Sequence, residues 1–264
     1  MPIEYRKMIL NYYETPIYYE IHGKGPVIVL LHGFLESLTM WERLIPILSS
    51  NRTVVVIDFP GFGKSGVVDT VHSMELMANI VNQIIVVHSF ETISIMGHSM
   101  GGYVGLAYCE IYPTTAKNLI LLNSTPAADS QEKKINRERV LRLIDKNSAL
   151  FLTMAIQNLF PADSLEKYAS EIEKMKSDVL SFPVEGIKAA ILGMTNRKDR
   201  TSVLKKFQGR KMMICGRNDP LIPYHVSTTL AKETFTPIIT LNGGHMGMIE
   251  NFNELHKIVT YPHF

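Results

Sequence analysis

Short apolar runs recur along the chain, and longer stretches with helical spacing of their apolar residues separate them. Apolar and polar residues do not alternate at the start of these runs, and each run ends at or just before a glycine or a polar residue. They lie at residues 27–31, 53–57, 92–99, 117–124, 211–219 and 237–245. Because such runs are typical of strands covered on both faces, they predict a parallel sheet. Two earlier aromatic runs, 7–13 and 17–21, flank Pro16 and predict an opening β-hairpin.

Helices are predicted between these strands. Their expected ranges are 38–49, 73–88, 100–112, 224–233 and 248–260. Ser73 is a suitable N-cap for the second of them, with Glu75 in the first turn. Alternating strands and helices indicate an α/β fold with a mainly parallel, doubly wound sheet that carries helices on both faces.

The segment 125–205 interrupts this alternation because it contains no strand-like run. Four helices are predicted there, and Pro161 and Pro183 separate some of them. The expected ranges are 129–146, 148–160, 163–180 and 183–195. We therefore predict a helical cap at 125–205, inserted into a core made of residues 1–124 and 206–264.

The second cap helix is apolar nearly all round, which indicates burial on more than one side. One interpretation is that it only packs against the core. The other is that some of its side chains, with Met154 and Phe160 as candidates, line a substrate pocket. Met246, which follows His245, is a further candidate for the lining of this pocket. Both interpretations stay open at this stage.

Composition narrows the function only slightly. The 264 residues are 46% hydrophobic and 20% charged, with a net charge of +2, which gives no support for a nucleic-acid or membrane partner.

Neither of the two cysteines, Cys109 and Cys215, belongs to a CxxC motif, so both are expected to be reduced and buried. No signal peptide or membrane span is recognisable, which favours a cytoplasmic location. The nine histidines show no metal-ligand spacing, so neither a metal nor another cofactor is expected.

The strongest chemical signal is the stretch Gly97-His98-Ser99-Met100-Gly101. A strand-like run precedes it and a helix-compatible stretch follows it. This is the G-x-S-x-G pattern, in which a sharp turn between strand and helix exposes a nucleophilic serine. Glycines are needed on either side because larger side chains would collide in such a turn. Ser99 is therefore the predicted nucleophile.

A serine needs a base and an oriented carboxylate before it can attack. His245 lies in a glycine-containing loop after the last strand, and its imidazole can accept a proton near neutral pH. Asp219 follows the preceding strand and can hold the imidazole in one tautomer. The chain order Ser99, Asp219, His245 is the order expected after this type of elbow.

Backbone N–H groups must stabilise the oxyanion that forms during attack. The N–H of Met100, directly after the serine, is one candidate. The second is expected in the loop after the third strand, where Phe34 follows Gly33. His32 and His98 flank these motifs and are expected to organise loops rather than to act in catalysis.

These motifs resemble the capped α/β-hydrolase superfamily along the whole chain, and most closely its small bacterial esterase-like members. The matching stretches are "LLHGF" (30–34), "DFPGFGKS" (58–65), "GHSMGG" (97–102), "GRNDP" (216–220) and "GGHMGMIE" (243–250). The resemblance implies an eight-stranded sheet with a helical cap between strands six and seven. It also implies a catalytic triad of Ser99, Asp219 and His245, with oxyanion donors at Phe34 and Met100.

The expected function is hydrolysis of a carboxylic ester or related small acyl substrate through an acyl-enzyme on Ser99. One alternative keeps the triad for carbon–carbon bond hydrolysis, thioester hydrolysis or a lyase step. A second alternative is a hydrolase-fold sensor that binds a small molecule with little turnover. The physiological substrate and the oligomeric state are not predicted.

The first cap helix carries six basic residues: Lys133, Lys134, Arg137, Arg139, Arg142 and Lys146. Their simplest interpretation is a solvated helix face. The alternative is that they attract an anionic substrate to the cap, and the sequence does not distinguish the two.

Overall fold

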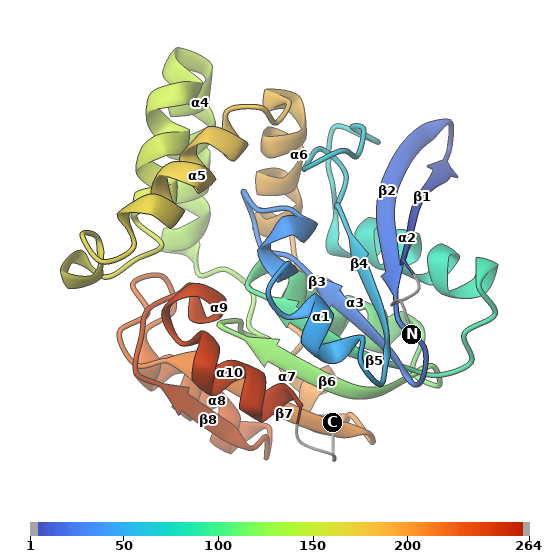
Figure 1. The fold of residues 1–264 in the computed structure, drawn as a ribbon. Coiled ribbons are helices and arrows are strands. Elements are labelled where there is room, and N and C mark those ends of the chain that lie inside the picture. The colour runs from blue at the N-terminus through green and yellow to red at the C-terminus, as the bar shows by residue number, and fades with distance from the viewer. Residues whose placement is uncertain (1–4, 261–264) are drawn as a thin grey trace.

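Eight strands form one sheet in residues 5–260, the part of the chain that the computed structural model describes (Figure 1). They are β1 Tyr5–Tyr12, β2 Thr15–His22, β3 Val27–Leu31, β4 Thr53–Ile57, β5 Ile93–His98, β6 Ala116–Leu122, β7 Arg210–Gly216 and β8 Ile238–Leu241. Their order across the sheet is β1-β2-β4-β3-β5-β6-β7-β8. Strands β1 and β2 pair antiparallel, β2 pairs antiparallel with β4, and all other pairs are parallel. The predicted hairpin and the mainly parallel sheet are therefore confirmed.

The central strands are apolar because both faces of the sheet are covered. Every residue of β4 is buried, as are all but the first residue of β3. Helices α2 (Met74–Val87) and α3 (Met100–Ile111) lie on one face, whereas α1 (Ile45–Leu48) and α10 (Phe252–Val259) lie on the other (Figure 1). This arrangement explains why the sequence shows no polar alternation along these strands.

The remaining core helices are short. They are η1 Leu38–Trp41, α7 Thr201–Lys206, α8 Tyr224–Glu233 and α9 Gly247–Glu250. The helix expected at 38–49 is divided into η1 and α1, because Pro46 fits only the first turn of a new helix. The helix expected at 248–260 is likewise divided, at the non-helical Asn251. Ser73 caps α2 as predicted, accepting a hydrogen bond from the Leu76 N–H at 3.0 Å.

Between β6 and β7 the chain forms only helices. Besides α7, they are α4 Gln131–Gln157, η2 Ala162–Ser164, α5 Ala169–Val179 and α6 Val184–Thr195. Helices α4, α5 and α6 stand together beyond one edge of the sheet (Figure 1). Helix α4 contains a break at Asn147, whose φ of −159° and ψ of 86° are not helical. Its side-chain Oδ1 accepts the Leu150 N–H and so restarts the helix. The break lies between the ranges 129–146 and 148–160 that the sequence predicts.

The boundaries of the cap at 125 and 205 stay a prediction. Both cysteines are buried and free, in agreement with the expectation from the sequence. Within residues 5–260, no helix is both long and apolar enough to cross a membrane.

Candidate active site

Ser99 lies at the turn between β5 and α3, in a backbone conformation that few residues adopt. Its φ is 49° and its ψ is −114°. Such a conformation costs about 1–3 kcal/mol and persists only where the surroundings enforce it. A Cβ on Gly97 would lie 2.3 Å from the Gly101 carbonyl oxygen, and one on Gly101 would lie 2.2 Å from that of Leu31. The tight turn therefore requires both glycines of the motif.

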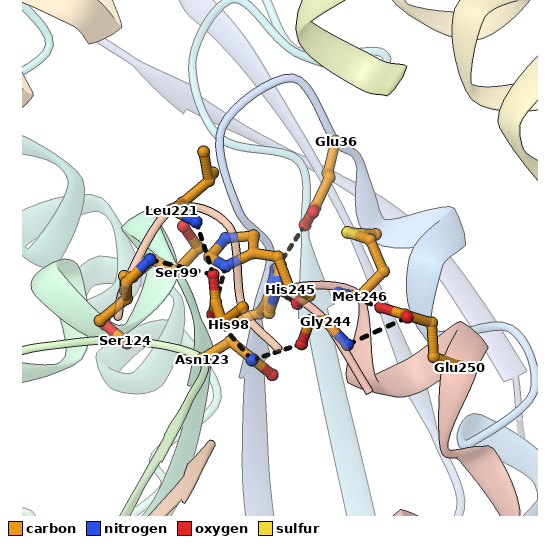
Figure 2. A network of polar contacts seen from close by, with 12 residues as sticks. Glu36, His98, Ser99, Asn123, Ser124, Leu221, Gly244, His245, Met246 and Glu250 are labelled. Carbon is orange, nitrogen blue, oxygen red and sulfur yellow. Dashed lines mark hydrogen bonds and ion pairs between the residues drawn. The ribbon is translucent and has the colours of Figure 1, made fainter. Parts of the chain in front are cut away.

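Hydrogen bonds to the next strand hold Ser99 in place. The Ser99 N–H donates to the Leu122 carbonyl at 3.0 Å, and the Ser124 hydroxyl donates to the Ser99 carbonyl at 2.7 Å (Figure 2). Leu122 is the last residue of β6, and Ser124 follows shortly after it. Ser99 is therefore held by β6 as well as by β5, the strand that it follows. Ser99 itself stays partly accessible.

Asp219 and His245 come together at this same edge of the sheet, since they follow the carboxyl ends of β7 and β8. The distance from Nδ1 of His245 to Oδ2 of Asp219 is 2.8 Å, and both side chains are almost fully buried. Although burial alone would raise the pKa of Asp219, the contact with His245 and several hydrogen bonds hold it below its usual value. The carboxylate therefore stays ionised and can accept the Nδ1 proton, which leaves Nε2 as the basic nitrogen.

Three further donors fix the Asp219 carboxylate. Its Oδ1 accepts the N–H groups of Leu221 at 2.8 Å and Ile222 at 3.0 Å. Its Oδ2 accepts the Asn123 side-chain amide at 3.0 Å, and the same amide nitrogen donates to the Gly244 carbonyl at 3.0 Å. Asn123 thus joins the Asp219 loop to the His245 loop. It was not predicted from the sequence, where its position directly after a strand is the only signal.

A buried pair, Glu36 and His98, connects the predicted oxyanion loop to the His245 loop. Glu36 Oε2 accepts the Gly33 N–H at 2.6 Å and lies 3.0 Å from His98 Nδ1. His98 Nε2 lies 2.9 Å from the His245 carbonyl oxygen and donates to it (Figure 2). Because both ring nitrogens of His98 face acceptors, the ring is charged. The sequence indicated an organising role for His98 but not its partner Glu36.

Glu250 fixes the other side of the His245 loop. Its Oε2 accepts the Gly244 N–H at 3.0 Å and its Oε1 accepts the Met246 N–H at 3.1 Å (Figure 2). The Tyr168 hydroxyl donates to the Glu250 carbonyl at 3.1 Å, so this loop also contacts the segment between β6 and β7. Glu250 was not predicted, because a glutamate in the first turn of a helix has no distinctive pattern.

The two predicted oxyanion donors flank Ser99. Met100 is the first residue of α3, and Phe34 lines the same chamber as Ser99. Within residues 5–260, neither of their N–H groups donates to another protein group. His32 supports the Phe34 loop: its Nδ1 donates to the Gly33 carbonyl at 2.7 Å and its Nε2 accepts the Phe59 N–H at 2.9 Å. Burial lowers the pKa of His32 to about 4, so the ring is neutral, as this bonding pattern requires.

Ser99 and His245 open into a chamber of about 570 Å³ beneath α4. Its apolar walls come mainly from the second half of that helix and include Leu143, Leu150, Phe151, Met154, Ala155 and Leu159. Asn147, the break in α4, also lines it, together with Glu36 and Lys146. The chamber has the size and apolar lining of a small-molecule site.

The three predicted pocket residues have different surroundings. Met154 lines this chamber. Phe160 is instead buried beside Tyr168, with ring centroids 6.1 Å apart, because the chain turns into the core after α4. Met246 is buried and lines a separate groove beside α5, because the side chain after His245 points away from the chamber.

The sequence matches the family model described as the alpha/beta hydrolase fold over residues 26–252. The chain therefore belongs to the α/β-hydrolase family, and its class is that of a hydrolase.

Several characterised or named proteins resemble it over nearly their whole length. A putative carbamate hydrolase RutD from Serratia proteamaculans (strain 568) is 28% identical over 252 residues, which is 92% of this chain and 94% of that protein. A pimeloyl-[acyl-carrier protein] methyl ester esterase from Aliivibrio salmonicida (strain LFI1238) is 24% identical, over 93% of this chain and 96% of that one. Among solved structures, a thermophilic esterase from Thermogutta terrifontis with malate bound superposes with a TM-score of 0.89 at 27% identity, covering 96% of both chains.

Proposed function

We propose that this protein is a serine hydrolase that cleaves a small carboxylic ester, with Ser99, His245 and Asp219 as its catalytic residues. The observation that carries the proposal is the 2.8 Å contact between His245 and Asp219 beside a strained serine, at the mouth of a largely apolar chamber. Relatives named as esterases support the ester as the substrate class.

The reaction follows from the positions of these groups. His245 Nε2 takes the proton of the Ser99 hydroxyl while the oxygen attacks the acyl carbon. The N–H groups of Phe34 and Met100 then stabilise the oxyanion of the tetrahedral intermediate. The imidazolium, stabilised by Asp219, returns the proton to the leaving alcohol as the carbon–oxygen bond breaks. Water repeats the sequence on the acyl-enzyme and releases the acid.

Carbamate hydrolysis is a second candidate, because the first relative above bears that name. The same attack of Ser99 on a carbonyl carbon would also cleave a carbamate. The lining of the chamber favours the ester, since carbamate is a small polar anion and would leave most of a 570 Å³ apolar space without a partner.

The test is steady-state hydrolysis of p-nitrophenyl esters of increasing acyl length, with Ser99→Ala beside the wild type. We expect sustained turnover that the variant loses by a factor of about 10⁴ or more. Near-normal activity of Ser99→Ala would overturn the mechanism. A single slow burst without turnover would instead favour a ligand sensor, and cleavage of carbamates or thioesters in preference to esters would change the substrate class.

A further inference from the structure

A second, smaller chamber meets the apolar one at the nucleophile. It has a volume of about 240 Å³ and shares Phe34, Ser99, Leu221 and His245 with the larger chamber. A substrate whose reactive carbon lies at Ser99 can therefore extend in two directions. Each direction offers a chemically different environment.

The smaller chamber is cationic, because its walls include Lys133, Asn136 and Arg137 from the first half of α4. No aspartate or glutamate is among the described residues that line it. The remaining walls of the smaller chamber are largely apolar. The larger chamber has a more extensive apolar lining, in which the cation Lys146 is accompanied by the carboxylate of Glu36. Along α4, the residues that line the smaller chamber, between 133 and 140, precede those that line the larger one, between 143 and 155.

Arg137 is held in a fixed orientation. Its Nε donates to Asp129 Oδ2, and Asp129 Oδ1 lies 2.7 Å from Arg197 Nη1. Arg197 is fully engaged, because it also donates to the carbonyls of Ala127 and Met194 and stacks over the ring of Tyr103 at 4.0 Å. In the part of the chain that is described, Nε is the only engaged nitrogen of the Arg137 guanidinium. Its two terminal nitrogens are therefore free to bind an anion with the fork geometry that suits carboxylates.

Lys133 supplies a second charge. The residue as a whole is exposed, but partial desolvation of its ammonium lowers the pKa of that group. The positive charges of Arg137 and Arg197 lower this pKa further, whereas the carboxylates of Asp129 and Asp219 raise it. Within residues 5–260, no hydrogen bond or ion pair connects this ammonium to another side chain. The carboxylates near this group of cations are already engaged: Asp129 with Arg137 and Arg197, Asp219 with His245, and Asp199 with the N–H groups of Ala128 and Thr201. A cation in this position gains from an anionic ligand.

We propose that the smaller chamber is an anion subsite, in which Lys133 and Arg137 bind a carboxylate carried by the substrate on a short arm beside its scissile ester. The apolar part of the substrate then lies in the larger chamber. This inference rests on the proposed function, and it specifies the substrate class as a carboxylate-bearing ester. The modest volume of the subsite restricts the charged arm to a few carbon atoms.

The experiment compares matched esters that differ only in charge. The p-nitrophenyl monoester of glutarate and p-nitrophenyl pentanoate test a carboxylate on the acyl side. The butanoyl ester of γ-hydroxybutanoate and butyl butanoate test one on the alcohol side, with acid release followed in a pH-stat. For at least one pair we expect kcat/KM of the anionic ester to exceed that of its neutral partner by about tenfold or more, through KM, as charge-assisted hydrogen bonds should allow. This preference should weaken with salt.

Two sets of variants on α4 separate the subsite from general attraction by a basic helix. Lys133→Gln, alone and with Arg137→Gln, should remove most of the anionic-to-neutral ratio. Lys134→Gln with Arg142→Gln removes cations from the same helix that line neither chamber, and should leave the ratio unchanged. Equal loss in both sets would overturn the subsite, as would an unchanged ratio in the first set. The single Lys133 variant breaks no hydrogen bond or ion pair of the described residues, so a folding defect is not expected to obscure the result.

A binding measurement makes the inference independent of turnover. Monomethyl glutarate should bind to Ser99→Ala about tenfold more tightly than methyl pentanoate, measured by ligand-observed NMR, and Lys133→Gln should abolish the difference. Neutral esters cleaved without any preference for anions would refute the subsite while the ester hydrolase stands. Tight binding of the anion without cleavage of any ester would refute the hydrolase while the subsite stands.

Discussion

The Nε2 of His98 donates to the backbone carbonyl of His245 at 2.9 Å, and its Nδ1 lies 3.0 Å from Glu36. The residue before the proposed nucleophile therefore positions the backbone of the proposed base, His245. Glu36 in turn accepts the Gly33 N–H, next to the predicted oxyanion donor Phe34. The segments that carry Ser99, His245 and Phe34 are thus connected through one buried ion pair.

Replacing His98 with leucine should leave Glu36 as an unpaired buried charge and destabilise the fold by about 3–5 kcal/mol. A shift of the His245 loop should also reduce kcat/KM by about ten- to a hundredfold. Chemical unfolding and steady-state kinetics measure the two effects. The double variant Glu36→Gln, His98→Gln is the control, because it removes both charges and should be less destabilised. A larger loss in the double variant would show that the ion pair is not the cause.

The same pair gives the stability a defined pH dependence. Burial alone would lower the pKa of His98, but the charge and hydrogen bond of Glu36 raise it above its usual 6.5. A raised histidine pKa contributes stability that is complete below 6.5 and is lost as the pH rises through the folded-state value. The unfolding free energy of the wild type should therefore fall relative to that of His98→Leu between pH 6 and pH 10. A constant difference over this range would contradict a charged His98.

Asn123 should tune the carboxylate of Asp219. Its amide hydrogen bond helps to hold the pKa of Asp219 low, so its loss should raise that pKa. The acidic limb of the pH–kcat/KM profile should move to higher pH, and kcat/KM should fall by about five- to a hundredfold. Because Asn123 has a φ of 44°, Asn123→Gly rather than alanine removes the side chain without adding backbone strain. An unmoved acidic limb in the glycine variant would exclude this role.

The elbow should not tolerate a methyl group at Gly101. An alanine Cβ there would lie 2.2 Å from a backbone oxygen of β3, which cannot move aside. We expect Gly101→Ala to lose all measurable activity and more than about 3 kcal/mol of stability. Gly105→Ala on the same helix is the control. Its Cβ would approach side-chain methyl groups, Ile95 Cγ2 at 3.1 Å and Leu119 Cδ1 at 3.3 Å, rather than backbone, and alanine favours the helix by about 1 kcal/mol. Equal stability of the two variants would contradict the steric argument.

The chamber beneath α4 should set the acyl-chain preference. Ala155 lines it, so Ala155→Phe should fill part of the space and shift the preferred p-nitrophenyl ester to a shorter chain. Gln157→Phe places the same side chain on an exposed position of α4 and should leave the preference unchanged. A parallel shift in both variants would place the acyl group elsewhere.

Local patterns were sufficient to predict most of the fold, and they indicated three side chains that the structure brings to one site. Apolar runs such as residues 53–57 predict buried strands because both faces of a parallel sheet exclude water. The elbow is recognisable because its steric requirement leaves a local signature, a glycine two residues before and two residues after Ser99. Ser99, Asp219 and His245 each follow the carboxyl end of a different strand. Because parallel strands end at the same edge of the sheet, the sequence could predict that the three residues lie close together.

Only the tertiary structure identified the groups that act across elements. Glu36 meets His98 across 62 residues, and Asn123 meets Asp219 across 96, so neither pair has a local signature in the sequence. For the same reason the sequence suggested Phe160 and Met246 as pocket residues: it records that a side chain is apolar but not the direction in which it points. The basic residues of α4 were recognised from the sequence alone. Lys133 and Arg137 line the same small chamber as Ser99, whereas Arg142 lines neither chamber. This difference depends on how the helix packs against the core, and packing is decided by contacts between distant segments.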